Sequence, residues 1–492
     1  MRKECGCYIH TVPTPPKSTP PEYTPRPLPA LKHDADGRRH VDLRVVLALS
    51  IPLFLNSSLQ AVLNLTDTWF IGRLSTTAMA GIGAVYWFVL VAILLLGGIG
   101  MAVQTVVAQA YGAGRNERAA RAAWAGFWGG WLSTPLFVLA ALAGPWLIAP
   151  FHLEPAIGQS AMEFWGPRML GGPIAVALWG LNGFFNGIGR TRVTLLVMVF
   201  VAVVNAMFNE IFMFRLNMGI AGSAWATMAA QATGLAIVIT IFTRQDVHSV
   251  FQSRHSWRPS FESIGRLVRL GIPMGFTVAV DVSGLALFQA MQVSLGPIGG
   301  AATQIVMMLT SIAYLPTVGL ALAGTTLVGQ SIGAGDRNWA MRVGTTTIAL
   351  CVGYMGVMGL TLGLSGPWLI PLFTAANDPL AGDVAALGVT LLWIGAAYQV
   401  FDGLNMGSAF CLRGAADVRV PTYLLIGLSW CVFVPLVHML TYRPGEGIVH
   451  FLPQFGFGAT GGWSAALVYT MLLGTTLLLR WRSGAWQKIR LH

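Results

Sequence analysis

The chain has 492 residues, of which 55% are hydrophobic and only 10% are charged. Together with a positive mean hydropathy, this composition excludes an ordinary soluble domain, which needs more charge on its surface. The net charge of +11 would suit a nucleic-acid-binding protein. However, the basic residues are distributed as membrane topology requires, so we expect no nucleic-acid partner.

Residues 1–42 precede the first apolar segment and form the first predicted region, an unstructured cytoplasmic tail. The stretch TVPTPPKSTPPEYTPRPLP is proline-rich, polar and basic, which favours an extended, unpacked chain. It has no apolar h-region, so we do not expect a cleaved signal peptide. Cys5 and Cys7 lack a second pair of ligands at metal spacing, and the other cysteines fall in apolar segments, where they pack as small residues.

Apolar segments recur along almost the whole remaining chain. Each is long enough to cross a hydrocarbon core of about 30 Å as an α-helix. They predict an all-α polytopic membrane protein with twelve transmembrane helices, at residues 45–72, 78–110, 120–144, 158–188, 192–214, 219–242, 263–295, 299–330, 341–366, 384–412, 418–441 and 459–481.

The Lys and Arg residues indicate the orientation of these spans. With the N-terminus inside, only Arg73, Arg168, Arg215 and Arg443 fall on the outer side. The positive-inside rule therefore predicts a multi-pass protein of the plasma (inner) membrane with both termini cytoplasmic.

The two halves of the chain resemble each other. SIP at 50–52 matches GIP at 271–273, and VAQAYGAGRN at 107–116 matches VGQSIGAGDR at 328–337, both at an offset of 221. GPWLIAPF at 144–151 and GIGRTRVT at 187–194 also have counterparts, GPWLIPLF at 366–373 and GAADVRVP at 414–421. The repeat predicts two six-helix bundles, 43–245 and 263–483, joined by a cytoplasmic linker, 246–262, and followed by a short tail, 484–492. Two copies with an even number of spans share one orientation, so the binding site is expected between them.

The Gly-Ala-Gly turns within the repeat have two interpretations. Such a turn could cradle a phosphate, but no Gly-Lys-Ser/Thr and no preceding strand accompany it. We therefore interpret these glycines as the inner ends of long helices.

Acidic residues inside the apolar segments are the main functional signal. Asp67, Asp281 and Asp402 lie well within predicted spans, and Glu210 lies in another. An acid at the centre of a membrane helix costs about 2.5–3.5 kcal/mol, so it is usually functional or paired. The repeat does not duplicate them, because Phe288 occupies the position equivalent to Asp67 and Gln60 the position equivalent to Asp281.

Polar residues accompany these acids at helical spacing. They form the series Gln60, Asn64, Asp67; Thr277, Asp281; Tyr398, Asp402, Asn405; and Asn205, Asn209. Such stripes must face the protein interior or a wet cavity. No in-span Lys or Arg is placed to pair with the acids, which suggests that they bind H⁺ or Na⁺. The alternative is a protonated acid that only links helices. Glu210 lies one residue off the Asn205/Asn209 stripe, and its role stays open.

Several of these motifs together resemble the MATE (multidrug and toxic compound extrusion) family, in particular its bacterial branch with acids in both bundles. They are TDTWFIGRL in the first span, the helix ends AQAYGAG and GQSIGAG, and CLRGAADVRVP after the tenth span. The resemblance covers roughly residues 42–485. It implies two pseudo-symmetric six-helix bundles in a V shape around a central cavity, with alternating access.

The resemblance also implies roles for individual residues. Asp67 corresponds to the acid of an N-terminal cation site, with Asn205, Asn209 and Thr227 as its other members. Many relatives have an acid where this chain has Asn209. Asp281, eight residues after Pro273, corresponds to a span-7 acid that is usually glutamate, and Tyr398 and Asp402 correspond to a span-10 pair. Asp281 and Asp402 would then be the ligands of Na⁺, if Na⁺ is the coupling ion.

The resulting functional hypothesis is a secondary antiporter, not an enzyme. It would export amphipathic organic cations in exchange for Na⁺ or H⁺, would need no other cofactor, and would act as a monomer in contact with membrane lipids. Candidate substrate-contacting residues are Gln60, Asn64, Phe288, Met307, Met308 and Asn405, since Met and aromatic side chains suit varied hydrophobic cations. The alternatives are a lipid-linked oligosaccharide flippase, which would need basic residues in its cavity, and a membrane enzyme, which would need clustered ligands or a nucleophile.

Overall fold

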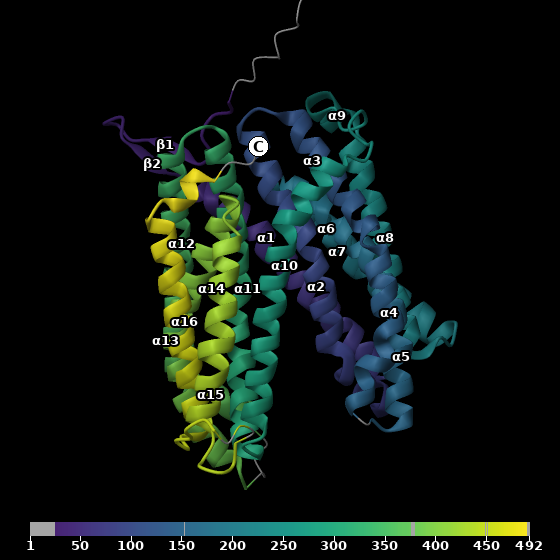
Figure 1. The fold of residues 1–492 in the computed structure, drawn as a ribbon, viewed down its shortest axis with the longest axis vertical. Coiled ribbons are helices and arrows are strands. Elements are labelled where there is room, and N and C mark those ends of the chain that lie inside the picture. The colour runs from purple at the N-terminus through teal and green to yellow at the C-terminus, as the bar shows by residue number, and fades with distance from the viewer. Residues whose placement is uncertain (1–24, 152, 375–378, 448, 450, 490–492) are drawn as a thin grey trace, which may run out of the picture.

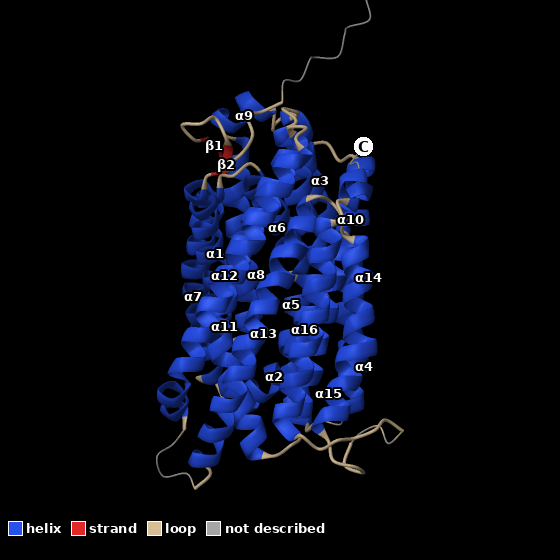
Figure 2. Cartoon of the chain, turned by 90° about the vertical axis from the view of Figure 1, so that its left-hand side faces the viewer, coloured by secondary structure: helices blue, strands red, loops and turns tan. Residues whose placement is uncertain are grey.

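The computed structural model describes residues 25–151, 153–374, 379–447, 449 and 451–489. Helices account for nearly all of it, and they run roughly parallel to one long axis with the loops gathered at the two ends (Figure 2). The helices of the N-terminal half are α1 Leu43–Gly72, α2 Thr76–Gly112, α3 Asn116–Leu132, α4 Thr134–Ile148, α5 Pro155–Leu170, α6 Gly172–Gly187, α7 Thr191–Asn209 and α8 Gly219–Thr243.

A short helix, α9 (Gln245–Phe251), lies in the linker, and the C-terminal half repeats the helical pattern. Its helices are α10 Phe261–Val293, α11 Pro297–Gly333, α12 Arg337–Leu369, α13 Ala381–Gly414, α14 Arg419–Leu428, α15 Val434–Thr441 and α16 Gly458–Arg482. Shorter helical turns extend several of them: η1 Ala149–Phe151, η2 Glu210–Arg215, η3 Ile370–Phe373, η4 Ser429–Phe433 and η5 Ala485–Lys488.

The described chain contains 11 helices that are long and apolar enough to cross a membrane. The sequence predicted twelve, and the difference lies at residues 158–188. That segment forms two helices, α5 and α6, which meet at Gly171 directly before Gly172 and Pro173. Proline has no backbone N–H and glycine is flexible, so this sequence favours a break. The crossing predicted at 158–188 is therefore made by two helices instead of one.

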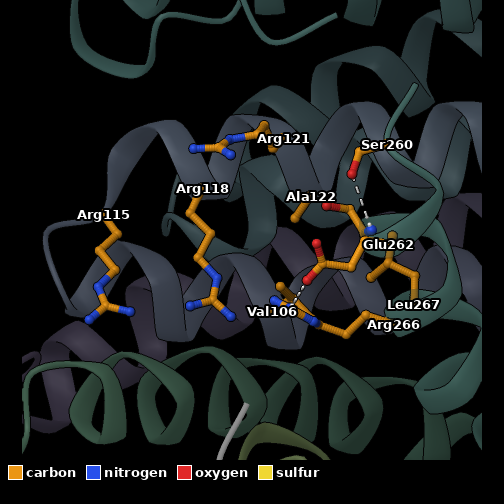
Figure 3. Close-up of a pocket in the computed structure, with 10 residues that line it drawn as sticks. Val106, Arg115, Arg118, Arg121, Ala122, Ser260, Glu262, Arg266 and Leu267 are labelled. Carbon is orange, nitrogen blue, oxygen red and sulfur yellow. Dashed lines mark hydrogen bonds and ion pairs between the residues drawn. The ribbon is translucent and has the colours of Figure 1, made fainter. Parts of the chain in front are cut away.

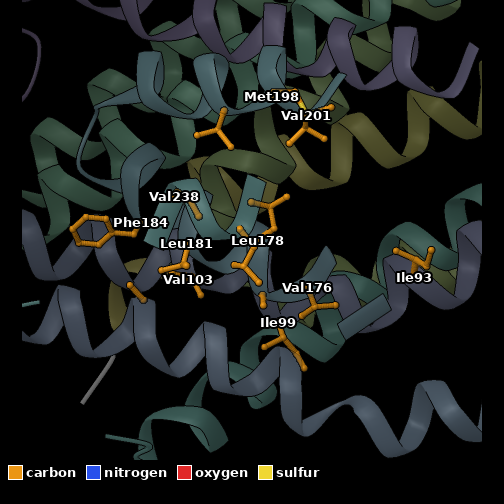
Figure 4. Packing of buried hydrophobic residues seen from close by; sticks show 14 of the residues in the cluster. Ile93, Ile99, Val103, Val176, Leu178, Leu181, Phe184, Met198, Val201 and Val238 are labelled. Atoms are coloured by element: carbon orange, nitrogen blue, oxygen red, sulfur yellow. The ribbon is translucent and has the colours of Figure 1, made fainter. Parts of the chain in front are cut away.

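The helices form two bundles that lie close together at one end and diverge toward the other (Figure 1). We call the end that carries α9 and η5 the closed end. Each bundle has its own apolar core. One core includes Val103, Val176 and Leu181 of α2 and α6 (Figure 4), and the other includes Phe288, Leu391 and Trp463 of α10, α13 and α16. The two-bundle architecture expected from the sequence repeat is confirmed.

The first helix of each half packs extensively against the other half. Helix α10 contacts α2, and α1 contacts α11. Glycines make these approaches possible. A Cβ atom on Gly98 would collide with the backbone of Gly271, and one on Gly319, its counterpart at the offset of 221, would meet Phe54 N at 2.6 Å. The close contacts between the halves therefore follow the internal repeat.

Hydrogen bonds between the halves follow the same symmetry near the closed end. Gln109 Nε2 donates to Gly414 O at 2.9 Å, and Gln330 Nε2 donates to Gly187 O at 2.8 Å. One turn away, the Thr105 hydroxyl donates to Arg413 O and the Thr326 hydroxyl donates to Asn186 O, both at 3.0 Å. These four bonds join α2 to α13 and α11 to α6, and we call them the symmetric clasp.

The expectation of an unstructured tail up to residue 42 is wrong for residues 25–42; residues 1–24, with Cys5 and Cys7, lie outside the described residues. Strands β1 (Leu31–His33) and β2 (Arg39–Val41) pair antiparallel, and Asp42 caps the N-terminus of α1. Residues 25–42 fold onto the bundles because apolar residues are interspersed among the prolines and can be buried. Ala30 is buried in a cluster with Val46, Leu327, Trp339 and Val343.

The same segment touches both halves of the protein. Arg26 donates its backbone N–H to Gly112 O at 2.9 Å, and its guanidinium lies 4.0 Å from the centre of the Tyr111 ring, in the N-terminal half. Further along, Pro29 O accepts from Trp339 Nε1 at 2.9 Å, and Arg39 pairs with Asp336 at 3.1 Å, in the C-terminal half. Residues 25–42 thus bridge the two bundles at the closed end.

Candidate functional site

The N-terminal bundle holds Asp67 in a compact hydrogen-bond network. Asn209 Nδ2 donates to Asp67 Oδ1 at 2.6 Å, and Thr227 Oγ1 lies 2.9 Å from Asp67 Oδ2. Asn205 joins the network, donating to Thr227 Oγ1 at 3.3 Å and accepting from Asn209 Nδ2 at 3.2 Å. The members come from α1, α7 and α8. The four residues that the resemblance grouped into one site are therefore in contact with one another.

The donors and acceptors of this network do not balance completely. Thr227 has one hydroxyl proton, yet its oxygen is also within 3.0 Å of Ser223 O. Asn209 Oδ1 is buried and has no partner among the described residues, and the same holds for Ser223 Oγ. A carboxylate that carried a proton could donate to Thr227 Oγ1, and a bound cation could use the free amide oxygen. The network has room for either.

A basic residue lies nearer to Asp67 than the sequence suggested. Arg168, in the last turn of α5, is close enough for its charge to interact with that of Asp67. The two side chains form no ion pair within 4.0 Å, and Arg168 Nη1 has no hydrogen-bond partner among the described residues. The membrane topology alone predicts only that Arg168 lies on the outer side. The broken crossing at Gly171 is the local structure that places it near the site.

The C-terminal bundle gathers two acids and three tyrosines. Asp402 is 7% exposed and accepts from Asn405 Nδ2 at 3.3 Å, one turn along α13. Asp281 of α10 is exposed and lies within range of the charge of Asp402. Tyr398 is near both acids. The two acids that sequence analysis paired are therefore brought together, one buried and one open.

Other members of this cluster were missed by sequence analysis. Tyr314 of α11 and Tyr469 of α16 interact with both acids, and Arg413 of α13 interacts with Asp281. Tyr469 OH is 2.8 Å from Ser429 Oγ. Tyrosine is common in membrane helices, so its spacing alone gave no signal. Arg413 lies near the end of α13, one residue beyond the predicted span 384–412.

Gln399 is a further residue that the sequence reading did not single out. It precedes the Asp402 turn on α13, is 1% exposed, and neither side-chain polar atom has a partner among the described residues. An unpaired buried amide costs about 1–3 kcal/mol. Such a residue next to an acid cluster is available to an incoming polar ligand.

The predicted substrate-contacting residues are not all equally accessible. Phe288 is 4% exposed and packs in the core between Phe433 and Trp463, with ring centres 6.0 and 5.7 Å away. Its burial gives it a packing role in this conformation, in contrast to Met308, which is 56% exposed. Met307 is partly buried against the same core. On α1, Gln60 and Asn64 are half-buried and 3.5 Å apart.

Two further polar positions have local roles. Thr277 Oγ1 is 2.8 Å from the carbonyl of Pro273 and 2.7 Å from Thr422 Oγ1, so it links α10 to α14. Glu210 is half-buried at the start of η2, a π-helical turn, and makes none of the hydrogen bonds of the Asp67 network. Among the described residues, no group of three or more His, Cys, Asp and Glu side chains could hold a metal ion.

Comparisons with known proteins agree with this architecture. A family model described as MatE matches residues 52–211 and 273–437, one stretch in each half. The "Probable multidrug resistance protein NorM" of Rhizobium meliloti is 28% identical over 468 residues, covering 91% of this chain and 94% of that protein. The protein of the same name from Pseudomonas putida is 32% identical over 424 residues, covering 83% and 89%.

Solved structures show the same fold. One, described as "Outward-facing conformation of a multidrug resistance MATE family transporter of the MOP superfamily", has a TM-score of 0.78 at 19% identity, covering 90% of this chain and 96% of its own. A second, a MOP superfamily transporter from Pyrococcus furiosus, has a TM-score of 0.77 at 20% identity, covering 91% and 97%.

Proposed function

The chain belongs to the MatE family, and from that premise we propose that it is a multidrug efflux transporter that exports amphipathic organic cations in exchange for Na⁺ or H⁺. Its NorM relatives are named as multidrug resistance proteins. The resemblance noted in the sequence is thereby confirmed at the level of the family. The coupling ion, the class of substrate and the residues that bind them are the content of the proposal.

The observation that carries the proposal is the acid cluster of the C-terminal bundle. Asp281 is exposed, although it lies in the middle of a membrane-length helix of 33 residues. An exposed carboxylate in such a helix needs water or a cation near it. Asp402 is close enough to repel it, and one cation bound between the two would relieve that repulsion.

The transport cycle follows from competition for this negative charge. An ion that enters from outside neutralises the acid, and the organic cation then loses its attraction and leaves. An inward gradient supplies about 2.3 kcal/mol per charge per 100 mV, in addition to the concentration term. Coupling requires only that the ion and the drug exclude each other at one site.

The conformation fits one end state of such a cycle. The symmetric clasp and residues 25–42 join the bundles at the closed end, and the bundles diverge at the other end (Figure 1). If the protein lies in the plasma membrane with the predicted topology, its closed end faces the cytoplasm. The molecule would then be open toward the outside, and export would require the closed end to separate.

The charges near the acids favour this function over a flippase. Asp281 has Arg413 nearby, and Asp67 has Arg168. Acids thus outnumber bases, whereas a pyrophosphate-linked substrate would need an excess of positive charge. The membrane-enzyme hypothesis gains no support from the relatives, which are multidrug resistance proteins and transporters.

The test is the efflux of ethidium, a fluorescent organic cation, from cells that express the protein. We expect Asp281→Asn and Asp402→Asn each to slow efflux by about 5- to 150-fold, the range of typical coupling free energies, at unchanged protein level. Asp383→Asn is the matched control, because Asp383 is exposed at the start of the same helix as Asp402. Wild-type efflux in both of the first two variants would rule out the assignment.

A further inference from the structure

A second, unrelated site is suggested by a cavity of about 340 Å³ at the closed end. Four arginines line it: Arg115, Arg118 and Arg121 from the start of α3, and Arg266 from the first turns of α10. Figure 3 shows Arg118 and Arg121 of α3, Arg115 directly before that helix, and Arg266 beside Glu262 on α10. The cavity thus lies between the N-terminal bundle and the first helix of the C-terminal half.

The lining carries an excess of positive charge. Glu262 is the acid among the lining residues, and it pairs with Arg266 at 3.0 Å. Arg121 pairs with Glu117, outside the lining, at 3.2 Å. Arg118 lies within charge range of the three other arginines. Among the described lining residues, four arginines therefore accompany one acid, and like charges held this close repel one another.

The equivalent place in the C-terminal half shows that the fold does not require three of the four arginines. At the offset of 221, Arg118 corresponds to Trp339, Arg115 to Asp336 and Arg266 to Val45, whereas Arg121 corresponds to Arg342. There, Trp339 is 2% exposed and packs with Val46, Leu327 and Val343 in an apolar cluster covered by residues 25–42. A cavity also lies beside Trp339, but its lining holds only two arginines, Arg39 and Arg342. The cluster of four arginines is therefore found in one half of the duplicated scaffold.

The chemistry of the lining indicates the class of ligand. Arginine presents a planar set of donors that matches phosphate oxygens in pairs. Ser260 and Ser263 add hydroxyl groups to the lining. The volume falls within the range of small-molecule pockets, about 300–1,000 Å³. Basic pockets between helices on the cytoplasmic side also suit lipid headgroups.

We propose that this cavity binds a phosphate-bearing anion, either the headgroup of an anionic lipid or a soluble phosphate compound. A ligand held by α3 and α10 together would stabilise their packing, because binding to the folded state alone raises its stability. This site is separate from the acids of the proposed transport cycle, and its test does not depend on transport.

The experiment uses the purified full-length protein in a neutral detergent and follows its thermal unfolding midpoint. One arm adds sodium pyrophosphate. The references are sodium chloride at equal ionic strength and sodium chloride at equal sodium concentration. The other arm adds phosphatidylglycerol, with phosphatidylcholine as the reference. Stabilisation by pyrophosphate identifies a soluble source, and stabilisation by phosphatidylglycerol alone identifies a lipid; both support the site.

Matched variants decide whether the cavity is responsible. Arg115→Gln with Arg118→Gln should weaken the apparent affinity of the stabilising anion by about tenfold or more, since bonds to charged groups are the strong ones. Arg337→Gln, an exposed arginine at the start of α12, should leave the affinity unchanged. Glu262→Gln should raise the affinity, and it keeps the test usable if the double variant does not fold.

Two results would overturn the proposal. The first is the absence of stabilisation by either anion. The second is stabilisation that is the same in the wild type, the arginine double variant and Glu262→Gln. In both cases the arginines would only contribute to the positive charge of the inner loops, which sets the orientation of the protein in the membrane.

Discussion

At the scale of single residues, the protein shows two ways of keeping a carboxylate among apolar helices. Asp67 is surrounded by amide and hydroxyl groups from two other helices, with bonds of 2.6 and 2.9 Å to Asn209 and Thr227. Asp281 is exposed and forms no hydrogen bond with the described residues, but it has a second acid within charge range. The first arrangement suits a carboxyl group that gains and loses a proton, and the second suits a site that waits for a cation.

Replacing Asp67 by Asn tests the role of the N-terminal network. The amide keeps the size and most hydrogen bonds of the side chain but cannot change its charge. We predict that ethidium efflux slows by about 5- to 150-fold while the protein level is unchanged. Thr68→Val is the control, because the Thr68 hydroxyl bonds only its own helix, at Asn64 O. Efflux at the wild-type rate in Asp67→Asn would mean that the Asp67 network only stabilises the structure and takes no part in transport.

Gln399 provides a prediction about stability. Since its buried amide has no partner among the described residues, Gln399→Met removes a desolvation cost of about 1–3 kcal/mol. The detergent-solubilised variant should unfold at a higher temperature than the wild type. Gln104→Met should do the opposite, because Gln104 Nε2 donates to Leu322 O at 3.1 Å and to Thr326 Oγ1 at 2.9 Å. A lower unfolding temperature for Gln399→Met would show that the amide is paired in the folded protein.

At the scale of secondary-structure elements, the symmetric clasp holds the closed end together from both sides of the internal repeat. Gln109 and Gln330 occupy equivalent positions, and each donates to the carbonyl of a glycine in the other half. The bonds end on backbone atoms, so they depend on the approach of the helices and not on a partner side chain. Separation of the bundles must break all four bonds of the clasp.

The double variant Gln109→Ala, Gln330→Ala should make that separation easier. A neutral hydrogen bond contributes about 0.5–1.5 kcal/mol, so losing two shifts the equilibrium toward an open inner end by about 5- to 150-fold. The distance between spin labels on exposed Gln245 and Asn338, with the native cysteines replaced, reports this shift. Gln289→Ala is the control, because Gln289 bonds Gln304 within one bundle. An unchanged distance distribution in the double variant would contradict the role of the clasp.

Residues 25–42 should stabilise the same closed end, because they contact Gly112 in one half and Trp339 in the other. Deleting residues 2–41 should therefore increase the population with a long distance between the same two labels. Deleting residues 2–24 removes only the part before these contacts and should leave the distribution unchanged. Equal effects of the two deletions would mean that the bridge does not hold the bundles.

The elements also show what the sequence could and could not predict. The spans were predictable because each is a long apolar run, and most observed ends lie within a few residues of the expected ones. The break at Gly171 was missed because mean hydropathy does not register a change of direction. The β1–β2 strands were missed because Leu31 and Val41 pack against a cluster that includes Leu327 and Trp339, which are distant in the sequence.

At the scale of the whole molecule, the internal repeat provides a symmetric scaffold, and the proposed sites lie at positions that depart from it. The glycine contacts and the clasp occur twice, whereas Asp67, Asp281 and the four-arginine cavity occur once. The candidate acids and the Asn205, Asn209 and Thr227 group were accessible from sequence because a carboxylate in an apolar helix is rare. Tyr314, Tyr469, Gln399 and the proximity of Arg168 depend on packing between helices, which no single segment reveals.

The most direct test of the central proposal, ion-coupled export, uses the purified protein in sealed vesicles loaded with ethidium. Efflux is measured with a Na⁺ gradient or a proton gradient imposed, for the wild type and Asp281→Asn. We predict that one of the two gradients drives efflux in the wild type, which identifies the coupling ion, and that the variant loses this response. Efflux that ignores both gradients, or that persists unchanged in Asp281→Asn, would contradict the account.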